Sequence, residues 1–394
     1  MRRAAAVIVA ALLLLSQTAC YGLRQINELG LVTAVGLDVG EKPGSVKLSV
    51  QIIRPADARG QTGAPAGGTG QPIYSVTAEG RTIFEAIRNL SHFTSRRVYW
   101  AHNFVIVMQE KYAREGIEDM IDFFTRNHEL RMSTWVAVTS DSPAELISTI
   151  TGLEVVPGEA VDRLYRNNHL TAQAPASNMR NLEEAFLSRS AQPVVARLQL
   201  VPRGISNKKP EQHGSLMQVE LAGAAAFHEG KMKGWLSVEE TRGMLFFLEK
   251  LRSGIEVVSC PNSSEQISLE FRQAKFKIQS SYVHNKPAFQ IRISTDADIV
   301  ESACTMPLDT ILPDLEQQLA EQLKKEIEAA INKAQHEYRT DFLKLSDVFR
   351  NQHPMEWREI AKDWDTLMAE SDINLLVEAK IKSAVVKTAE AGVK

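Results

Sequence analysis

The spacing of apolar residues changes repeatedly along this chain, and these changes limit the folds that it can adopt. Alternating apolar residues, as in Leu31–Leu37 and Val46–Ile52, are typical of strands with a buried face. Apolar residues three or four positions apart, as in Ile83, Ile87 and Leu90, are typical of one face of a helix. Because the two patterns follow each other through most of the sequence, we expect helices packed against sheets.

The first half of the chain alternates between short strands and helices. "NFVIVM", which starts at Asn103, is apolar almost throughout and predicts a buried strand. Ala56–Pro72 is rich in glycine, alanine and proline and predicts a mobile loop. No lysine follows its glycines as a phosphate-binding loop requires. The other predicted elements are strands at Ile73–Val76, Thr134–Thr139 and Val194–Val201, and helices that start at the capping motif Thr82–Glu85, near Ile117, at Ser142–Glu145 and at Asn181.

The second half contains longer elements. Leu315, Leu319, Leu323, Ile327 and Ile331 repeat every fourth residue, which predicts a slanted apolar stripe on a helix lying across a sheet. The other predicted elements are a strand at Gln218–Phe227 with a turn at His228–Gly230, a helix from the capping motif Ser237–Glu240 through Leu251, alternating strands around Ile267–Ile278 and Phe289–Ile299, the helix Pro313–Tyr338, a short helix with Trp357 and Trp364 in the core, and a final strand at Ile373–Ile381.

These patterns predict a multi-domain α+β fold with mixed sheets and helices packed against them. We place a signal peptide at residues 1–19 and an N-terminal α/β region, with one or two subdomains, at 20–205. The polar stretch Arg203–Gly214 is the predicted boundary, and a C-terminal α+β domain follows at 216–390.

The N-terminus, "MRRAAAVIVAALLLLSQTAC", has the pattern of an export signal. Two arginines precede an apolar run from Ala4 to Leu15, which is too short to cross a bilayer as a mature helix but suits a signal peptide. Small residues just before Cys20 are typical of a bacterial lipoprotein processing site, although Gln17 stands where an aliphatic residue is usual. We therefore predict that Cys20 becomes the N-terminus and carries a diacylglycerol and an amide-linked acyl chain. The alternative is a plain secretory signal in which Cys20 is incidental.

Composition excludes some other classes of function. The formal net charge is −3 over 394 residues, so the chain has no basic excess that would favour nucleic acid. Two further cysteines, Cys260 and Cys304, fall in the same predicted domain and form either a disulfide or two buried thiols. No histidine or cysteine lies near them at the spacing of a zinc site, so we expect neither a metal nor a cofactor.

The segment Thr94–Ala113 groups Arg96, Arg97, Tyr99, Trp100 and His102, and it is the most conspicuous candidate for a site. Glutamates in the neighbouring helices argue against a nucleic-acid patch, so Tyr99 and Trp100 are interpreted as packing residues at a strand edge. His102-Asn103 is expected to form backbone hydrogen bonds at a turn. Three His-Glu pairs start at residues 128, 228 and 336, but none continues to the second histidine of a zinc protease helix, and no nucleophile-elbow motif is present.

Six stretches resemble the C-subunit lipoproteins of spore germination receptors, the GerAC-like family. They are "INELGLVTAVGLD", "EGRTIFEAIRNLS", "RRVYWAHNFVIVM", "GWLSVEETRGML", "AINKAQHEYRTDFL" and "HPMEWREIAKDWD", and they run in order from Gln25 to about Lys382. Tyr21-Gly22 departs from the Trp-Asp pair that often follows the lipidated cysteine.

The resemblance implies a non-enzymatic subunit of a nutrient (germinant) receptor. Its partners would be the integral-membrane A and B subunits of the receptor, and it would be anchored through Cys20 on the outer face of the spore inner membrane. Two alternatives stay open on the residues alone: an exported lipoprotein hydrolase, and a lipoprotein that binds a solute. The hydrolase would need a fixed carboxylate pair or an activated nucleophile, and the solute-binding protein a cleft between two similar lobes.

Overall fold

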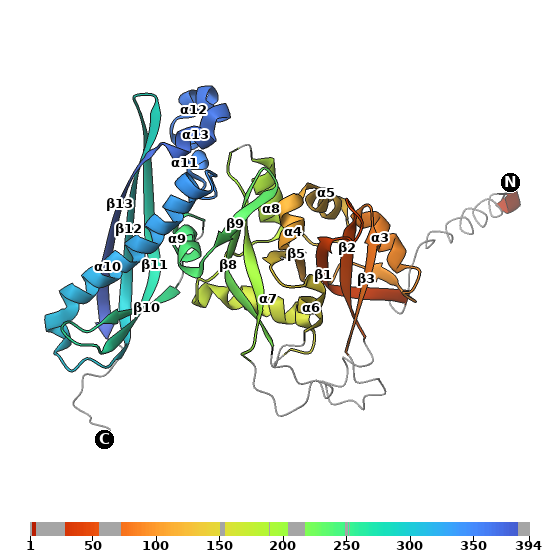
Figure 1. The fold of residues 1–394 in the computed structure, drawn as a ribbon, viewed down its shortest axis with the longest axis horizontal. Coiled ribbons are helices and arrows are strands. Elements are labelled where there is room, and N and C mark those ends of the chain that lie inside the picture. The colour runs from red at the N-terminus through yellow and green to blue at the C-terminus, as the bar shows by residue number, and fades with distance from the viewer. Residues whose placement is uncertain are drawn as a thin grey trace, which may run out of the picture.

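The computed structural model describes residues 2–4, 28–54, 72–149, 154–188, 190–203, 217–248, 251 and 253–384 (Figure 1). Cys20, most of the predicted signal peptide, nearly all of the predicted Ala56–Pro72 loop and most of the Arg203–Gly214 boundary lie outside these residues. Within them, strands and helices form two mixed sheets, which confirms the expected multi-domain α+β fold. In this part of the chain no helix is both long enough and apolar enough to cross a membrane.

The larger sheet in the described ranges has nine strands in the order β3-β2-β1-β5-β6-β7-β8-β9, with the short strand β4 beside the start of β1. β1 is parallel to β4 and β5, and β5, β6 and β7 are parallel to one another, whereas both ends of the sheet are antiparallel. The strands are β1 (Leu29–Val39), β2 (Val46–Ile53), β3 (Ile73–Gly80), β4 (Arg97–Tyr99), β5 (Val105–Gln109), β6 (Trp135–Thr139), β7 (Val194–Val201), β8 (Gln218–His228) and β9 (Lys231–Leu236).

Helices cover both faces of this sheet, so its central strands are apolar on both sides. Along β5, Ile106 and Met108 enter the core on one face, and Val105 and Val107 enter the core on the other. This confirms the buried strand predicted from "NFVIVM". On the first face lie α3 (Ile83–Leu90), α4 (Glu110–Glu115), α5 (Glu118–Arg126) and α8 (Met179–Leu187); on the second lie α6 (Pro143–Ser148) and α7 (Pro157–Asn167), the latter followed by a 3-10 turn at Asn168–Leu170.

The smaller sheet has the order β10-β11-β12-β13 and is crossed by one long helix, α10 (Figure 1). The predicted slanted stripe is confirmed, because Leu315, Leu319, Leu323 and Ile327 are fully buried against the sheet. The elements are α9 (Val238–Leu248), β10 (Ser253–Ser259), β11 (Gln266–Val283), β12 (Lys286–Ser302), α10 (Leu308–Asn332) with a π turn at Lys333–Glu337, α11 (Leu345–Gln352), α12 (Pro354–Ile360), a 3-10 turn at Ala361–Asp363, α13 (Trp364–Ala369) and β13 (Asp372–Ala384).

The two middle strands of this sheet form a hairpin that is longer than the alternation predicted. His284 and Asn285 make the two-residue turn, and both have a positive φ (50° and 62°), as the favoured two-residue hairpin turns require. β10 pairs with β11 only as far as Arg272. Further along, the side chain of Gln352 at the end of α11 accepts a hydrogen bond from the Ser280 amide (2.7 Å) and donates one to the Ile278 carbonyl (3.1 Å).

The two sheets are joined by β8, β9 and α9. β8 and β9, which the sequence placed at the start of the C-terminal domain, hydrogen-bond into the larger sheet. Residues of β8 also belong to the core beneath α10, and the Tyr338 hydroxyl donates to the Trp235 carbonyl (2.7 Å). Between α9 and α10, a side chain at Gly243 would collide with the Glu326 carbonyl, so glycine permits this close approach. The domain limits 20–205 and 216–390 stay a prediction.

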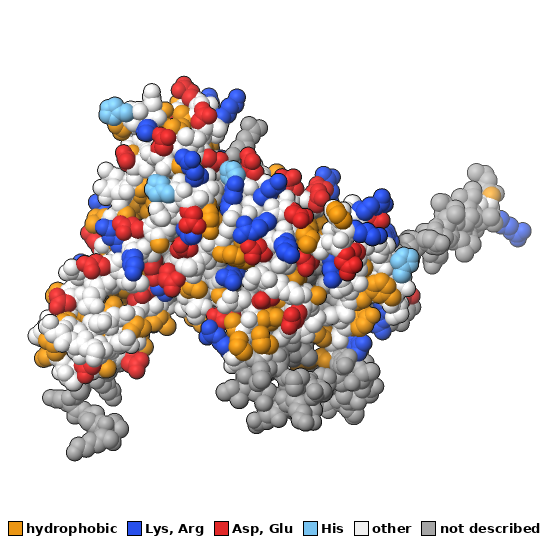
Figure 2. Space-filling model, in the orientation of Figure 1, with side chains coloured by type: hydrophobic (Ala, Val, Ile, Leu, Met, Phe, Trp, Pro, Cys, Tyr) orange, Lys and Arg blue, Asp and Glu red, His pale blue; other side chains and the backbone are white. Residues whose placement is uncertain are grey.

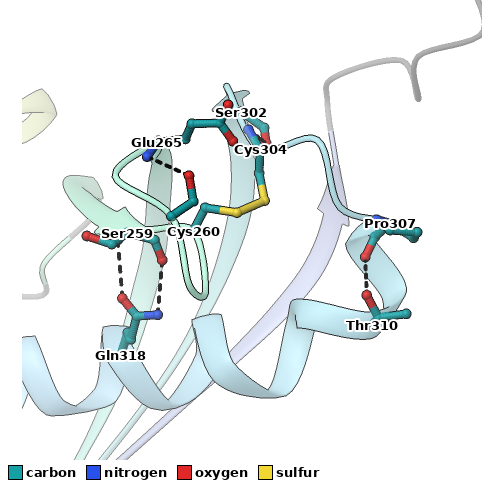
Figure 3. The surroundings of a disulfide bond; sticks show 9 residues. Ser259, Cys260, Glu265, Ser302, Cys304, Pro307, Thr310 and Gln318 are labelled. Carbon is teal, nitrogen blue, oxygen red and sulfur yellow. Dashed lines mark hydrogen bonds between the residues drawn. A yellow bond between two sulfur atoms is a disulfide. The ribbon is translucent and has the colours of Figure 1, made fainter.

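A disulfide resolves the alternative left open for two cysteines. Cys260 follows β10 and Cys304 follows β12, and their sulfur atoms are bonded, with the Cα atoms 5.7 Å apart (Figure 3). The Cys260 amide also donates to the Glu265 carbonyl (2.8 Å). Next to the disulfide, Gln318 of α10 exchanges two hydrogen bonds with the backbone of Ser259 (Figure 3). The bond therefore links the end of β10 to the end of β12 across the start of β11.

Candidate functional site

A shallow pocket of about 370 Å³ lies where α3, β4 and α5 meet, and we call it the α3–α5 pocket. Of the conspicuous residues of the Thr94–Ala113 segment, Arg97 and Trp100 line it, together with two further aromatic rings, two further arginines and a histidine from the neighbouring helices and the turn after α5. Its lining includes Phe84, Arg88, Arg97, Trp100, Arg126 and His128.

Local sequence explains how these side chains reach the pocket. Thr82 caps α3 by accepting a hydrogen bond from the Glu85 amide (3.1 Å), which confirms the predicted helix start. The buried face of α3 then leaves Phe84 and Arg88, one turn apart, on its outer side. β4 pairs with the first residues of β1, and alternation along this short strand turns Val98 inward and Arg97 outward.

Two of the aromatic residues of the pocket, Trp100 and Phe123, pack into or against the core, whereas Phe84 is exposed. Trp100 is only 4% exposed, and its ring meets Phe124 edge to face with centroids 5.9 Å apart. Phe123 extends the contact, at 5.1 Å from Phe124 and 6.4 Å from the exposed ring of Phe84. The interpretation of Trp100 as a packing residue is therefore confirmed, and Tyr99 is partly buried beside it.

The pocket's charges are mostly paired. Arg97 contacts Glu129 (2.8 Å), and Arg126 contacts Asp122 one turn away on α5 (2.6 Å). The Arg88 guanidinium lies over the Phe84 ring, 4.8 Å from its centroid. Phosphate-backbone recognition needs a broad basic field, and this local mixture of both signs does not supply one.

His102 and Asn103 form a turn, as expected. The Asn103 amide N–H donates to the Trp100 carbonyl (3.0 Å), and the Thr134 hydroxyl donates to the Asn103 carbonyl (3.1 Å). His102 is exposed. The side-chain amide of Asn103 is buried and has no hydrogen-bond partner within the described part of the chain, a feature that the sequence did not indicate.

A histidine, a carboxylate and a hydroxyl do come together elsewhere, at the junction of the two sheets. His228 Nδ1 lies 3.3 Å from the Thr340 hydroxyl, and His228 Nε2 lies 3.8 Å from Asp365. Burial raises the pKa of Asp365, and the nearby His228 partly offsets that effect. A hydrolase would need an accessible nucleophile here, yet Thr340 is fully buried and its hydroxyl donates to the Phe227 carbonyl (3.2 Å). The group therefore links β8 to α13 rather than presenting a nucleophile to a substrate.

The remaining His-Glu pairs do not assemble a metal site. His128 lies at the α3–α5 pocket and His336 is exposed beside β13, so the two histidines lie on separate surfaces. In the ranges that the structure describes, the one group with metal-ligand proximity is Cys260, Glu265 and Cys304, and both sulfur atoms of that group are in the disulfide.

The sequence did not predict one buried ionic cluster, because its three residues come from three different elements. Arg242 of α9 contacts Glu256 of β10 (2.6 Å) and Glu326 of α10. Burial, and then repulsion from Glu326, raise the pKa of Glu256 to about 7. Both carboxylates are nearly inaccessible, at 5% and 2% exposed, so the cluster holds α9 and α10 to the sheet rather than facing a substrate.

Comparison with known proteins agrees with this two-sheet fold. A model of the spore germination protein N-terminal domain matches residues 22–200, and a model of the spore germination B3/GerAC-like C-terminal domain matches residues 222–384. These matches define the class: a spore germination protein that has both the N-terminal and the C-terminal domain. The chain belongs to the GerAC-like family.

Individual relatives match over almost their whole length. Spore germination protein KC of Bacillus subtilis (strain 168) is 24% identical over 390 residues, which is 95% of each chain. Spore germination protein B3 of the same organism is 24% identical over 97% of this chain and 98% of its own. The crystal structure of the GerBC protein shares the fold, with a TM-score of 0.52 and 22% identity over 91% of this chain and 99% of that chain.

Proposed function

We propose that this protein is a lipid-anchored, non-enzymatic subunit of a germinant receptor complex. It is held through Cys20 on the outer face of the spore inner membrane and acts by contact with the integral-membrane A and B subunits. The observation that carries the proposal is the family match, which spans both sheets and so includes the whole scaffold rather than one module.

The geometry of the polar clusters supports a role without chemistry. The arrangement most like a catalytic group, His228 with Thr340 and Asp365, has a fully buried hydroxyl. The buried carboxylates Glu256 and Glu326 are tied to Arg242 between structural elements. A role by contact needs neither an open cleft nor an activated nucleophile.

The anchor is tested by Cys20→Ala. We expect this variant to remain unprocessed or to leave the membrane fraction, because a diacylglycerol and an amide-linked acyl chain together give the two-chain anchoring that a single chain does not. The measurement is fractionation of spore membranes with electrophoretic mobility as the second readout. A Cys20→Ala protein that fractionates and migrates like the wild type contradicts the anchor.

The partner assignment is tested by affinity purification of the tagged, full-length protein from spore inner membranes. We expect two integral-membrane proteins to co-purify, and mass spectrometry identifies them. Recovery of the wild-type protein without any integral-membrane partner contradicts the receptor assignment, even if the anchor is present.

A further inference from the structure

One surface at the N-terminal end of the larger sheet combines exposed aromatic rings with arginines. We call it the anchor-side face and define it by Phe84, Arg88, Phe93, Arg96, Arg97 and Arg126, from α3, the turn after it, β4 and α5. Phe84 and Phe93 expose 52% and 51% of their surface. Figure 2 shows hydrophobic side chains next to Lys or Arg side chains over this end of the molecule, near α3.

The charge of this face is positive, although the chain as a whole carries −3. Glu85, Asp122 and Glu129 lie beside it, and each is paired with an arginine: Glu85 with Arg81, Asp122 with Arg126, and Glu129 with Arg97. Arg88 and Arg96 have no carboxylate partner among the residues that the structure describes. The face therefore keeps an excess of positive charge beside two exposed rings.

The covalent chain places this face near the proposed anchor. β1 begins at Leu29, whose register partner is Arg97. Only the eight residues Tyr21–Glu28 lie between Cys20 and Leu29, and even a fully extended chain of this length spans about 30 Å. The smaller sheet lies at the opposite end of the molecule (Figure 1). An acylated Cys20 therefore brings Arg97 and its neighbours, rather than the smaller sheet, toward the bilayer.

We infer that the anchor-side face docks on the surface of an anionic phospholipid bilayer. Arg88 and Arg96 meet lipid phosphates, and Phe84 and Phe93 enter the boundary between headgroups and acyl chains. Basic residues gain from the negative potential of such a surface, and apolar rings add burial. The inference rests on the proposed anchor, because the tether supplies the orientation, and it adds which side of the protein faces the lipid.

The experiment uses the acylated, full-length mature protein with one added cysteine. Cys260 and Cys304 are bonded to each other and Cys20 is acylated, so Ser95→Cys supplies the thiol for a polarity-sensitive nitrobenzoxadiazole label. Ser95 is exposed between Phe93 and Arg96. Ser281→Cys, an exposed site on β11 of the smaller sheet, is the matched control. Both proteins are reconstituted in vesicles of phosphatidylcholine, with or without phosphatidylglycerol.

We expect the Ser95 label to brighten and shift to the blue in vesicles with phosphatidylglycerol, and the Ser281 label to stay as it is in buffer. Arg88→Gln and Arg96→Gln should each lower the ratio of docked to undocked protein by roughly five-fold, the factor that corresponds to one arginine near an anionic surface. High salt should abolish the response, because it screens surface charge.

Three results overturn the inference. The Ser95 label stays unchanged although the protein floats with the vesicles, in which case the anchor stands and the docking does not. The response is the same in both lipids and insensitive to the arginines. Or the Ser95 thiol cross-links to a membrane protein in spores without any response in vesicles, which assigns the face to a protein partner. If mass spectrometry finds no acyl group on Cys20, the anchor fails, and the same labelled protein added to preformed vesicles still tests the face.

Discussion

Glu256 shows how a single residue can make the stability of this protein depend on pH. Its carboxyl group has an ordinary pKa of 4.5, and burial beside Glu326 raises the value to about 7 in the folded state. The folded protein therefore holds a proton between these values that the unfolded chain releases. Stability is greatest below pH 4.5 as far as this group is concerned, and it falls as the pH rises through 7.

Glu256→Gln should remove this loss, since glutamine cannot ionise and Arg242 keeps Glu326 as its partner. We expect the variant to be more stable than the wild type at pH 8, by on the order of 1–3 kcal/mol, and to differ little near pH 4.5. The measurement is urea unfolding across this range. Glu270→Gln is the control. Hydrogen bonds from Arg272 and Ser253 lower the pKa of Glu270, so this substitution should lower the stability at pH 8 rather than raise it. Equal stability of Glu256→Gln and the wild type at pH 8 refutes the assignment.

For individual residues, the sequence predicted burial better than it predicted hydrogen-bond partners. The prediction that Trp364 lies in the core is confirmed, since the residue is 2% exposed. Its indole N–H donates to Asp341 (3.0 Å), which also accepts hydrogen bonds from the amides of Leu345 and Ser346. Periodicity identifies the apolar face of a helix. It does not indicate that the indole N–H of Trp364 donates to a buried carboxylate 23 residues away in the chain.

Among the elements, the disulfide defines a measurable contribution to the smaller sheet. It joins residues 44 positions apart, at the ends of β10 and β12. Replacement of both Cys260 and Cys304 by serine should lower the free energy of unfolding by roughly 2–4 kcal/mol, mainly because the unfolded chain loses a cross-link. Denaturant unfolding with and without reductant measures the effect.

The wild type serves as its own control in that experiment. Reductant should shift the wild-type transition toward that of the double serine variant and should leave the variant unchanged. A wild-type transition that is insensitive to reductant would show that the two thiols are not joined in solution.

Element types followed from the sequence more closely than strand partners did. The strands β5, β6 and β7 and the capped starts of α3, α6 and α9 occur where the apolar spacing and capping residues predicted them. The joining of β8 and β9 to the larger sheet was not foreseen, because strand order depends on contacts between distant segments. The α3–α5 pocket was not predicted either, because its walls come from three separate elements whose contacts the sequence does not show.

For the molecule as a whole, a role by contact predicts which substitutions germination tolerates. His102→Gln and His128→Gln should leave nutrient-triggered germination unchanged where the protein level is normal, since both side chains are exposed and neither joins a catalytic group in the described residues. Arg88→Glu combined with Arg96→Glu should reduce it, because this reversal places like charges on the anchor-side face against an anionic surface.

The assay compares nutrient-triggered germination with germination forced by a route that bypasses the receptor. The arginine reversal should reduce nutrient-triggered germination and leave germination by the bypass route unchanged. If a single conservative histidine substitution abolished the nutrient response at a normal protein level and with normal assembly, the protein would contain a discrete ligand or catalytic site, and the scaffold role would be wrong.

The contact of Gln352 with β11 has a consequence for aggregation. A strand edge with free N–H and C=O groups is a template on which a second chain can add a strand. Beyond Arg272, β11 lacks β10 as a neighbour, and there Gln352 occupies the Ser280 amide and the Ile278 carbonyl. One amide side chain thus interrupts the edge with its own donor and acceptor, which disfavours the pairing of two copies through this part of β11.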